Sequence, residues 1–392
     1  MRPPRRELFV LTIPAIAIAV VVSMVLVEAW VRMRWDDRRG TPGFYMSDPI
    51  LGQRLTPGYR GWFAGVPVEI NSLGFRDTRD YSLDKPRGTF RILILGDSVT
   101  FGHGALSDTT YPYLLEQRLK QWRGEVGWQV WNLGVPGYNT SQELEYLKLV
   151  ATPYQPDLVI VGFYENDLSG NELPRRPSTG RRAASALQRA MQRRLYSYEL
   201  YKRIALTIRW HWLADSPDRG RIEALATDEA LLNLPSDRSG ESAQRLSEVE
   251  TFADAGAFVC REIDRNPNRD RLSTHLAKQS REMEAWRRAV ESFQQLNRDG
   301  VYRVAFFINM APNECPGEDR YFDGGAFEDE DALRNILGNG TPVGSSVRAF
   351  IPYRPSQMPG ASGHSIGNAN RVKANALFEF LAADVLPKAL PR

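Results

Sequence analysis

The pattern of apolar residues changes twice along the chain. Residues 8–27 form an almost unbroken apolar run, and residues 40–89 hold only short apolar pieces among Gly, Pro and Asp. From residue 90, apolar runs of strand length alternate with segments of helical periodicity. Such alternation is typical of a parallel α/β sheet. We therefore predict a three-layer α/β/α fold with a central parallel sheet, preceded by one N-terminal helix and carrying a helical insertion.

The predicted strands are short apolar runs, and the predicted helices repeat apolar positions at helical spacing. We expect strands at residues 91–95, 129–133, 158–163, 303–309 and 346–351. We expect helices at residues 111–122, 142–150, 277–297, 328–337 and 368–386. The run at 158–163 is nearly continuous in Val and Ile, which indicates a strand buried on both faces.

The apolar run at the N-terminus is long enough to cross a bilayer as a helix. Arginines flank it on both sides and do not decide its orientation, but a large domain can be exported regardless of nearby charge. A cleaved signal peptide is the alternative, although the run is long for one. We expect a cytoplasmic tail at residues 1–7, a single-pass transmembrane helix at 8–29, and the rest of the chain outside the cytoplasm.

No convincing strand lies between about residues 170 and 275. We therefore divide the rest of the chain into a membrane-proximal extension at 30–89, which looks like a small irregular β module, and an α/β domain at 90–392 interrupted by this insertion. The insertion begins with Arg175–Arg203, which holds nine basic residues, one acidic residue and apolar residues at helical spacing. Such a helix can lie on anionic lipid or an acidic partner, or it can pack one face on the domain.

Composition excludes few functions. The 392 residues suit two or three domains or one large domain, and the formal charge of +3 gives no sign of a nucleic-acid partner. Cys260 and Cys315 lack metal-ligand spacing, so they either pair in an oxidising compartment or remain free thiols. The acidic run at 318–331 is typical of a solvated loop and a helix N-terminus rather than of a metal site. We expect no cofactor and no metal.

Four short segments carry the candidate chemistry, and all are predicted at the carboxyl edge of the sheet, where α/β folds bind ligands. They are Gly96-Asp97-Ser98, residues 132–137 (NLGVPG), residues 162–167 (GFYEND) and Gly363-His364. Their order and residue types resemble the SGNH hydrolase (GDSL esterase/lipase) superfamily. The resemblance covers roughly residues 90–170 and 277–388, and residues 70–77 (INSLGFRD) look like its bacterial membrane-anchored members. The resemblance implies an SGNH/flavodoxin-like fold. It also implies a protein anchored in the bacterial inner membrane, with the bulk of the chain in the periplasm.

The resemblance also implies a role for each motif residue. Ser98 would be the nucleophile, and His364 would be the base that takes its proton. The backbone N–H groups of Ser98 and Gly137 and the side-chain amide of Asn166 would form the oxyanion hole. Acyl transfer needs this set of a nucleophile, a base and fixed donors. His103, His211 and His275 lack motif support as catalytic groups, and we expect Asp97 and Asp167 to brace loops rather than to react.

One position departs from the family pattern. The family carries an Asp two or three residues before the histidine, where this chain has Ser362 and Ala361. That acid orients the imidazole, fixes its tautomer and stabilises the imidazolium. Either Ser362 or a backbone carbonyl orients His364 in a Ser–His dyad, or catalysis has been lost.

Two functions of different classes follow. The first is a membrane-anchored periplasmic esterase or O-acyltransferase, acting on an O-acylated carbohydrate such as an acetylated envelope polysaccharide. The second is a catalytically inactive accessory subunit that braces integral-membrane partners in a complex for polysaccharide export, respiration or photosynthesis. A carbohydrate-binding module that reuses the cleft is the weakest alternative, because nothing in the sequence indicates a sugar platform.

Overall fold

The computed structural model describes residues 5–172, 190–204 except 192 and 202–203, 272–315 and 318–390. Most of the predicted insertion, with Cys260 and His211, lies outside these residues. A five-stranded sheet with all neighbours parallel occupies the centre, in the order β11-β8-β7-β5-β6. Its strands are β5 (Thr89–Gly96), β6 (Gly127–Gly134), β7 (Leu158–Phe163), β8 (Val304–Ile308) and β11 (Val343–Ser345). The predicted parallel α/β sheet is confirmed.

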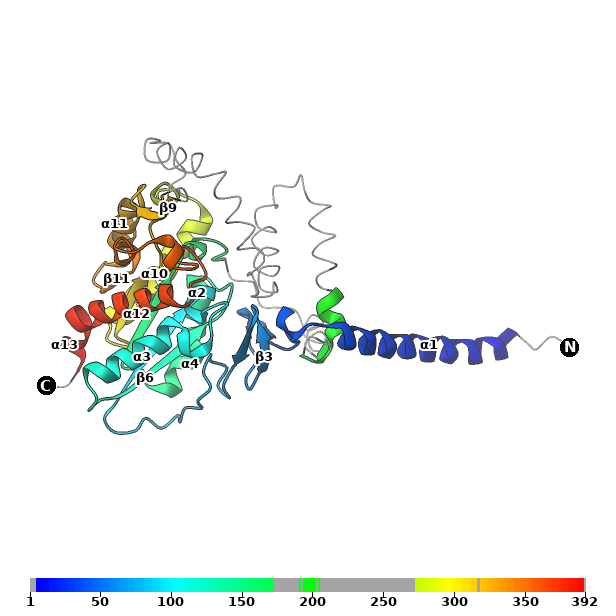
Figure 1. The fold of residues 1–392 in the computed structure, drawn as a ribbon. Helices are drawn as coiled ribbons and strands as arrows, with labels where there is room; N and C mark the ends of the chain where they lie inside the picture. Colours follow the sequence, from blue (N-terminus) through cyan, green and yellow to red (C-terminus); the bar gives the residue numbers. More distant parts are fainter. Residues whose placement is uncertain are drawn as a thin grey trace.

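Helices cover both faces of the sheet (Figure 1). Leu93 and Leu95 of β5 pack in one core, and Ile92 and Ile94 pack in the other, as the two-residue period of a strand requires. The first core includes residues of α4 (Thr140–Tyr154), α10 (Arg281–Arg298) and α11 (Ala326–Leu337). The second core includes residues of α3 (Tyr111–Trp122), α12 (Asn368–Phe380), the π-helical turn Leu381–Val385 and α13 (Leu386–Ala389).

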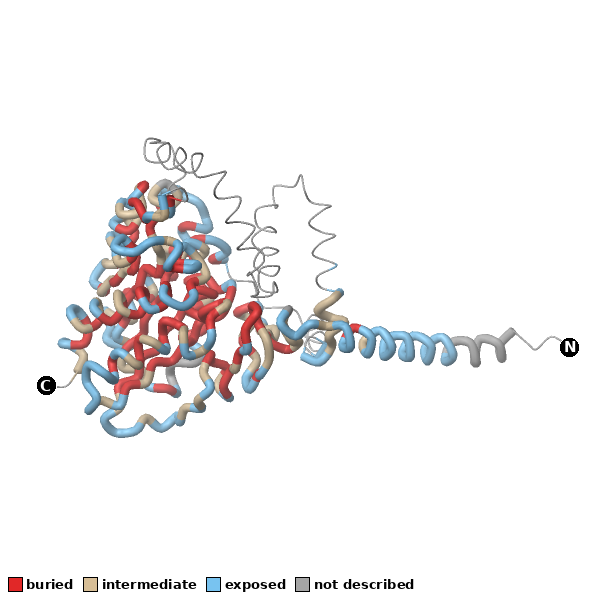
Figure 2. Tube along the Cα trace, viewed as in Figure 1, coloured by how far each residue is buried: buried red, intermediate tan, exposed pale blue. Residues whose placement is uncertain are grey.

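The N-terminal helix α1 (Arg5–Arg34) projects away from the α/β domain (Figure 1), and its described residues are mostly exposed (Figure 2). Its segment Pro14–Arg34 has a mean hydropathy of 2.2 and is long enough to cross a bilayer. By length and composition, this helix could serve as a membrane anchor or as a signal sequence.

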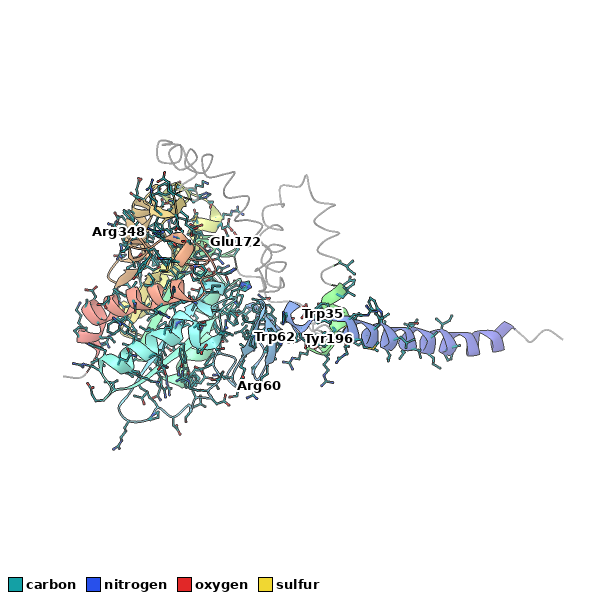
Figure 3. All side chains as sticks on the ribbon, in the orientation of Figure 1. Trp35, Arg60, Trp62, Glu172, Tyr196 and Arg348 are labelled. Carbon is teal, nitrogen blue, oxygen red and sulfur yellow. The ribbon has the colours of Figure 1, made fainter. Side chains whose placement is uncertain are left out.

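A helical segment at residues 196–201 lies beside the end of α1. Glu28 of α1 accepts hydrogen bonds from the backbone N–H of Tyr196 and from the N–H and hydroxyl of Ser197. The rings of Trp35 and Tyr196 lie 6.0 Å apart at this junction (Figure 3). The described part of the predicted basic helix is therefore fixed to α1.

Two β-hairpins follow α1, namely β1 (Tyr45–Asp48) with β2 (Gly52–Leu55), and β3 (Arg60–Phe63) with β4 (Val66–Glu69). They lie between α1 and the sheet (Figure 1), where Figure 3 labels Arg60 and Trp62 on β3. Their apolar side chains join the same core as β5 and α2 (Ser98–Phe101); Phe44 and Phe63 both contact the ring of Phe101. The predicted irregular β extension is thus packed onto the α/β domain.

One predicted strand is wrong. Residues 346–351 form the 3-10 helix η4 (Val347–Phe350), and the last strand is the shorter β11 just before it. The last ladder bond runs from the Ser346 N–H to the Ile308 carbonyl, and the Ser346 hydroxyl donates to the Met310 carbonyl where the chain turns into η4. The turn then buries Phe350 completely, so the apolar pattern belongs to a helical turn.

Other boundaries shift by a few residues. The helix expected from residue 277 is divided into α9 (Leu272–Leu276) and α10, because Ser280 caps α10 by accepting the N–H of Met283. A small antiparallel pair, β9 (Asn313–Cys315) and β10 (Arg320–Phe322), follows β8. Cys315 is disulfide-bonded, and Cys260 is the only other cysteine of the sequence.

Candidate active site

Three neighbouring strands end at the same level. Gly96 of β5 pairs with Gly134 of β6 on one side and with Gly162 of β7 on the other. The motif residues Ser98, Gly137 and Asn166 follow these glycines by two to four positions. Because the strands are parallel, the sheet brings the three predicted segments to one carboxyl edge.

The glycines let the short helix α2 lie directly over the strand ends. A Cβ atom on Gly134 would come within 2.3 Å of the Phe101 nitrogen, and one on Gly162 within 2.6 Å of the Thr100 hydroxyl oxygen. Asp97 caps α2 by accepting the N–H of Val99 at 2.8 Å. The predicted bracing role of Asp97 matches this contact, and Ser98 becomes the first residue of the helix.

Ser98 and His364 meet across the site. The His364 Nε2 atom lies 2.8 Å from the Ser98 Oγ atom, which is hydrogen-bonding distance. His364 comes from the loop before α12, where Ile366 donates its N–H to the Pro359 carbonyl and Asn370 donates its amide to the Ser365 carbonyl. The structure therefore brings together the predicted nucleophile and the predicted base.

Two of the three predicted oxyanion donors have no hydrogen-bond partner among the described residues. The backbone N–H groups of Ser98 and Gly137 donate to no other group in the described part of the chain. Gly137 has a φ of +80°, in the left-handed region that favours glycine. Asn166 lies in the 3-10 helix η3 (Glu165–Leu168), and its side-chain oxygen is buried without a hydrogen-bond partner.

Asp167 braces the turn that holds Asn166, as predicted, by accepting the N–H of Tyr164 at 2.8 Å. It is fully buried near Glu143, whose two carboxyl oxygens have no hydrogen-bond partner among the described residues. Burial and the neighbouring carboxyl raise the pKa of Asp167 well above its usual range, and burial and Asp97 raise that of Glu143.

Ser362 does not orient His364. Its hydroxyl donates to Glu314 at 2.7 Å, and its backbone carbonyl accepts the Tyr164 hydroxyl at 2.7 Å. The single proton of the hydroxyl is thus committed to the Glu314 carboxylate of β9. The expectation that Ser362 supports the base is wrong for this conformation.

A second histidine contacts the base instead, and no sequence motif pointed to it. The Nδ1 atoms of His103 and His364 lie 3.1 Å apart, and the two rings are nearly perpendicular. His103 follows α2, where Gly102 and His103 both donate their N–H to the Ser98 carbonyl and so turn the chain back toward the nucleophile. The only available signal was its position five residues after Ser98, beyond one helical turn.

The surroundings of His364 disfavour its charged form. Burial and the nearby Lys373 lower its pKa to about 4. Lys373 itself is fully buried in α12, and burial lowers its pKa to about 7. His364 is therefore neutral at pH 7, which is the form that can accept a proton from Ser98.

The hairpins before β5 support the site. Gln53 of β2 donates its amide to the Pro136 carbonyl, beside Gly137, and Gln142 of α4 donates to the Leu51 carbonyl. The Phe63 ring of β3 lies 5.6 Å from the His103 ring. Among the residues described, no group of three or more His, Cys, Asp or Glu side chains could hold a metal ion.

Comparisons with known proteins find one family model and several solved structures that are similar to this chain. Residues 94–233 match the model of the GDSL-like Lipase/Acylhydrolase family. A comparison with curated proteins finds no match. Solved structures with a similar chain path include an acetylxylan esterase from Geobacillus stearothermophilus, with 11% identity over 75% of this chain and 95% of that one and a TM-score of 0.38. A putative GDSL-like lipase from Parabacteroides merdae has 11% identity over 75% and 95%, with a TM-score of 0.36. An α/β hydrolase from the metagenome of Lake Arreo, Spain, has 14% identity over 75% and 95%, also with a TM-score of 0.36.

Proposed function

Because this chain belongs to the SGNH hydrolase superfamily, of the GDSL-like lipase/acylhydrolase type, we propose that it is an ester hydrolase or O-acyltransferase that uses Ser98 and His364. The observation that carries the proposal is the 2.8 Å contact between the His364 Nε2 and the Ser98 Oγ atoms. A neutral imidazole at this distance can accept the hydroxyl proton as the oxygen attacks.

The reaction would proceed in two halves. Ser98 Oγ attacks the ester carbonyl carbon while its proton moves to His364 Nε2, and the carbonyl oxygen becomes an oxyanion facing the N–H groups of Ser98 and Gly137 and the amide of Asn166. The tetrahedral intermediate collapses, and the leaving alcohol takes the proton from His364. In the second half, a water or an acceptor hydroxyl gives its proton to His364 and attacks the acyl-serine carbonyl carbon. The second tetrahedral intermediate then collapses, the bond to Ser98 Oγ breaks, and His364 returns the proton to Ser98. Water gives hydrolysis, and a second alcohol gives acyl transfer.

The substrate we propose is an acylated polyol, such as an acetylated envelope polysaccharide. A cavity of about 260 Å³ lies beside η3, next in sequence to Asn166. Its lining includes the polar residues Glu165, His275, Asn313 and Asp329. Such side chains suit a hydroxyl-rich alcohol better than a lipid chain. With α1 as an anchor, the site would face material outside the inner membrane, in the periplasm.

Turnover by the full chain in detergent tests the proposal. We expect hydrolysis of 4-nitrophenyl acetate and covalent labelling of Ser98 by a fluorophosphonate, identified by peptide mass spectrometry. Ser98→Ala should abolish labelling and reduce kcat/KM by about three orders of magnitude or more. The matched control Ser292→Ala, on the outer side of α10, should behave as the unmodified chain.

The outcomes separate the two classes of function. Absence of both Ser98-dependent turnover and Ser98 labelling in a folded chain would refute the enzyme. Co-purification of that inactive chain with integral-membrane proteins would then favour the accessory subunit.

A further inference from the structure

We propose that His103 is the positioning residue that supports His364, in the place where the family uses a carboxylate. This inference rests on the proposed function, because it concerns how the base of that reaction is oriented. In the described part of the chain, the His364 ring has two hydrogen-bond partners, Ser98 at Nε2 and His103 at Nδ1. His103 therefore occupies the side of the ring that a triad acid would face.

The chemistry of the contact assigns the protons. To act as a base toward Ser98, His364 must present a lone pair at Nε2, so its proton is on Nδ1. The Nδ1 atom of His103, 3.1 Å away, must then be the acceptor. A neutral His103 meets this requirement when its own proton is on Nε2. The contact thus fixes the tautomer of His364 that can take a proton from the nucleophile.

The surroundings keep His103 neutral. The side chain is buried, and its neighbours His364 and Arg76 disfavour a positive charge on its ring. Burial, together with His364 and with the charge of Arg76 from the segment before β5, lowers the pKa of His103 well below its usual range. On the side of His364, the charged neighbours are Lys373 of α12 and Asp97, whose carboxylate lies 3.4 Å from the Ser98 hydroxyl.

A neutral partner performs only part of the work of a carboxylate. It orients the ring and selects the tautomer, but it supplies no negative charge to stabilise the imidazolium. The Oδ1 atom of Asp or Asn is as many bonds from the backbone as the Nδ1 atom of histidine. His103→Asp therefore adds the missing charge at the same place, His103→Asn keeps a neutral acceptor, and His103→Phe removes the acceptor.

Kinetics of the full chain with 4-nitrophenyl acetate test the proposal. We expect His103→Phe to lower kcat at least tenfold with little change in KM, and His103→Asn to retain most of the activity. His103→Asp should raise kcat/KM and move the acid limb of its pH profile to higher pH, because a carboxylate favours the imidazolium. A merely structural role would not produce that shift. Equal pH limbs for the His103→Asp and unmodified chains, or full activity of a folded His103→Phe, would overturn the proposal.

A second readout does not depend on turnover. The sequence contains four histidines, so 15N NMR of the histidine-labelled chain can report the tautomer of each ring. We expect the Nδ1–H form for His364 and the Nε2–H form for His103, with a mixed His364 population in His103→Phe. An Nε2–H form of His364 in the unmodified chain would refute the inference. Absence of Ser98-dependent chemistry with the expected tautomers would instead refute the proposed function alone.

Discussion

His364 is surrounded by groups that disfavour a positive charge on its ring. Burial and Lys373 together lower its pKa to about 4, whereas an unperturbed histidine titrates near 6.5. Lys373 is charged below its own lowered pKa of about 7. The base should therefore remain available at acidities where an ordinary histidine is protonated, and it should be a weak base for the same reason.

The rate of fluorophosphonate labelling of Ser98 against pH tests this description. We expect the rate to fall as the pH decreases through about 4, because protonated His364 cannot accept a proton. Lys373→Met should move this limb to higher pH by removing a positive neighbour. The exposed control Lys388→Met should leave it in place. A labelling rate that falls near pH 6.5 in the unmodified chain would contradict the lowered pKa of His364.

At the scale of elements, Arg76 holds the turn between α2 and α3. Its guanidinium donates to the carbonyls of Phe101, Gly102 and Ala105 and lies over the Phe101 ring. This turn carries His103, so a residue from the segment before the sheet fixes the position of the second histidine. A planar group with several donors can satisfy three carbonyls at once, which lysine cannot do.

Arg76→Met should therefore weaken both the fold and the site. Three buried carbonyls would lose the Arg76 donor. Those of Phe101 and Gly102 would keep a second donor, from the Asn132 amide and the Ala105 N–H, whereas that of Ala105 would keep none among the described residues, at a cost of about 1–3 kcal/mol for this group and less for the other two. Since removal of a buried cation offsets part of this, we expect a loss of roughly 2–4 kcal/mol in the free energy of unfolding, measured in urea. Ser98 labelling should slow as well. The control Arg60→Met changes an exposed arginine of β3, and its free energy of unfolding should lie within about 0.5 kcal/mol of that of the unmodified chain. Equal free energies of unfolding for the two variants would contradict the proposed role of Arg76 in holding the turn.

At the scale of the whole molecule, the extension before residue 90 packs into the same core as the domain that carries the candidate site. Its residues Phe44, Leu51, Phe63 and Phe75 are buried in the same core as β5. Removal would expose this apolar surface and delete Gln53 and Arg76, which hold the loops of Gly137 and His103. The region matched by the family model, which begins at residue 94, is therefore smaller than the unit that folds.

Two truncations measure the size of that unit. A chain that starts at residue 35 lacks α1 but keeps both hairpins, and we expect a cooperative urea transition and Ser98 labelling. A chain that starts at residue 88 should aggregate or lose the transition, because its core would face water. A soluble, labelled 88–392 chain would show that the extension is dispensable.

Local patterns predicted most of the fold, because buried strands and amphipathic helices carry strong periodicity. The motif residues Ser98, Gly137 and Asn166 were predictable because each follows a strand end. Ser346 shows the limit, since an apolar run does not tell a short strand from a helical turn whose serine ends the ladder. His103 was missed because its partner is 261 residues away in sequence. The error at Ser362 has a similar origin, since Glu314, which accepts the proton of its hydroxyl, lies 48 residues away in strand β9.

The contact between the two imidazoles also bears on how such a site can change over time. Every histidine codon becomes an aspartate codon by replacement of its first base alone. Because aspartate would present its oxygen where the Nδ1 atom of His103 now lies, one nucleotide separates a neutral support from a charged one, with the backbone unchanged. The proposed catalytic strength is in this sense a property that a single mutational step can raise or lower.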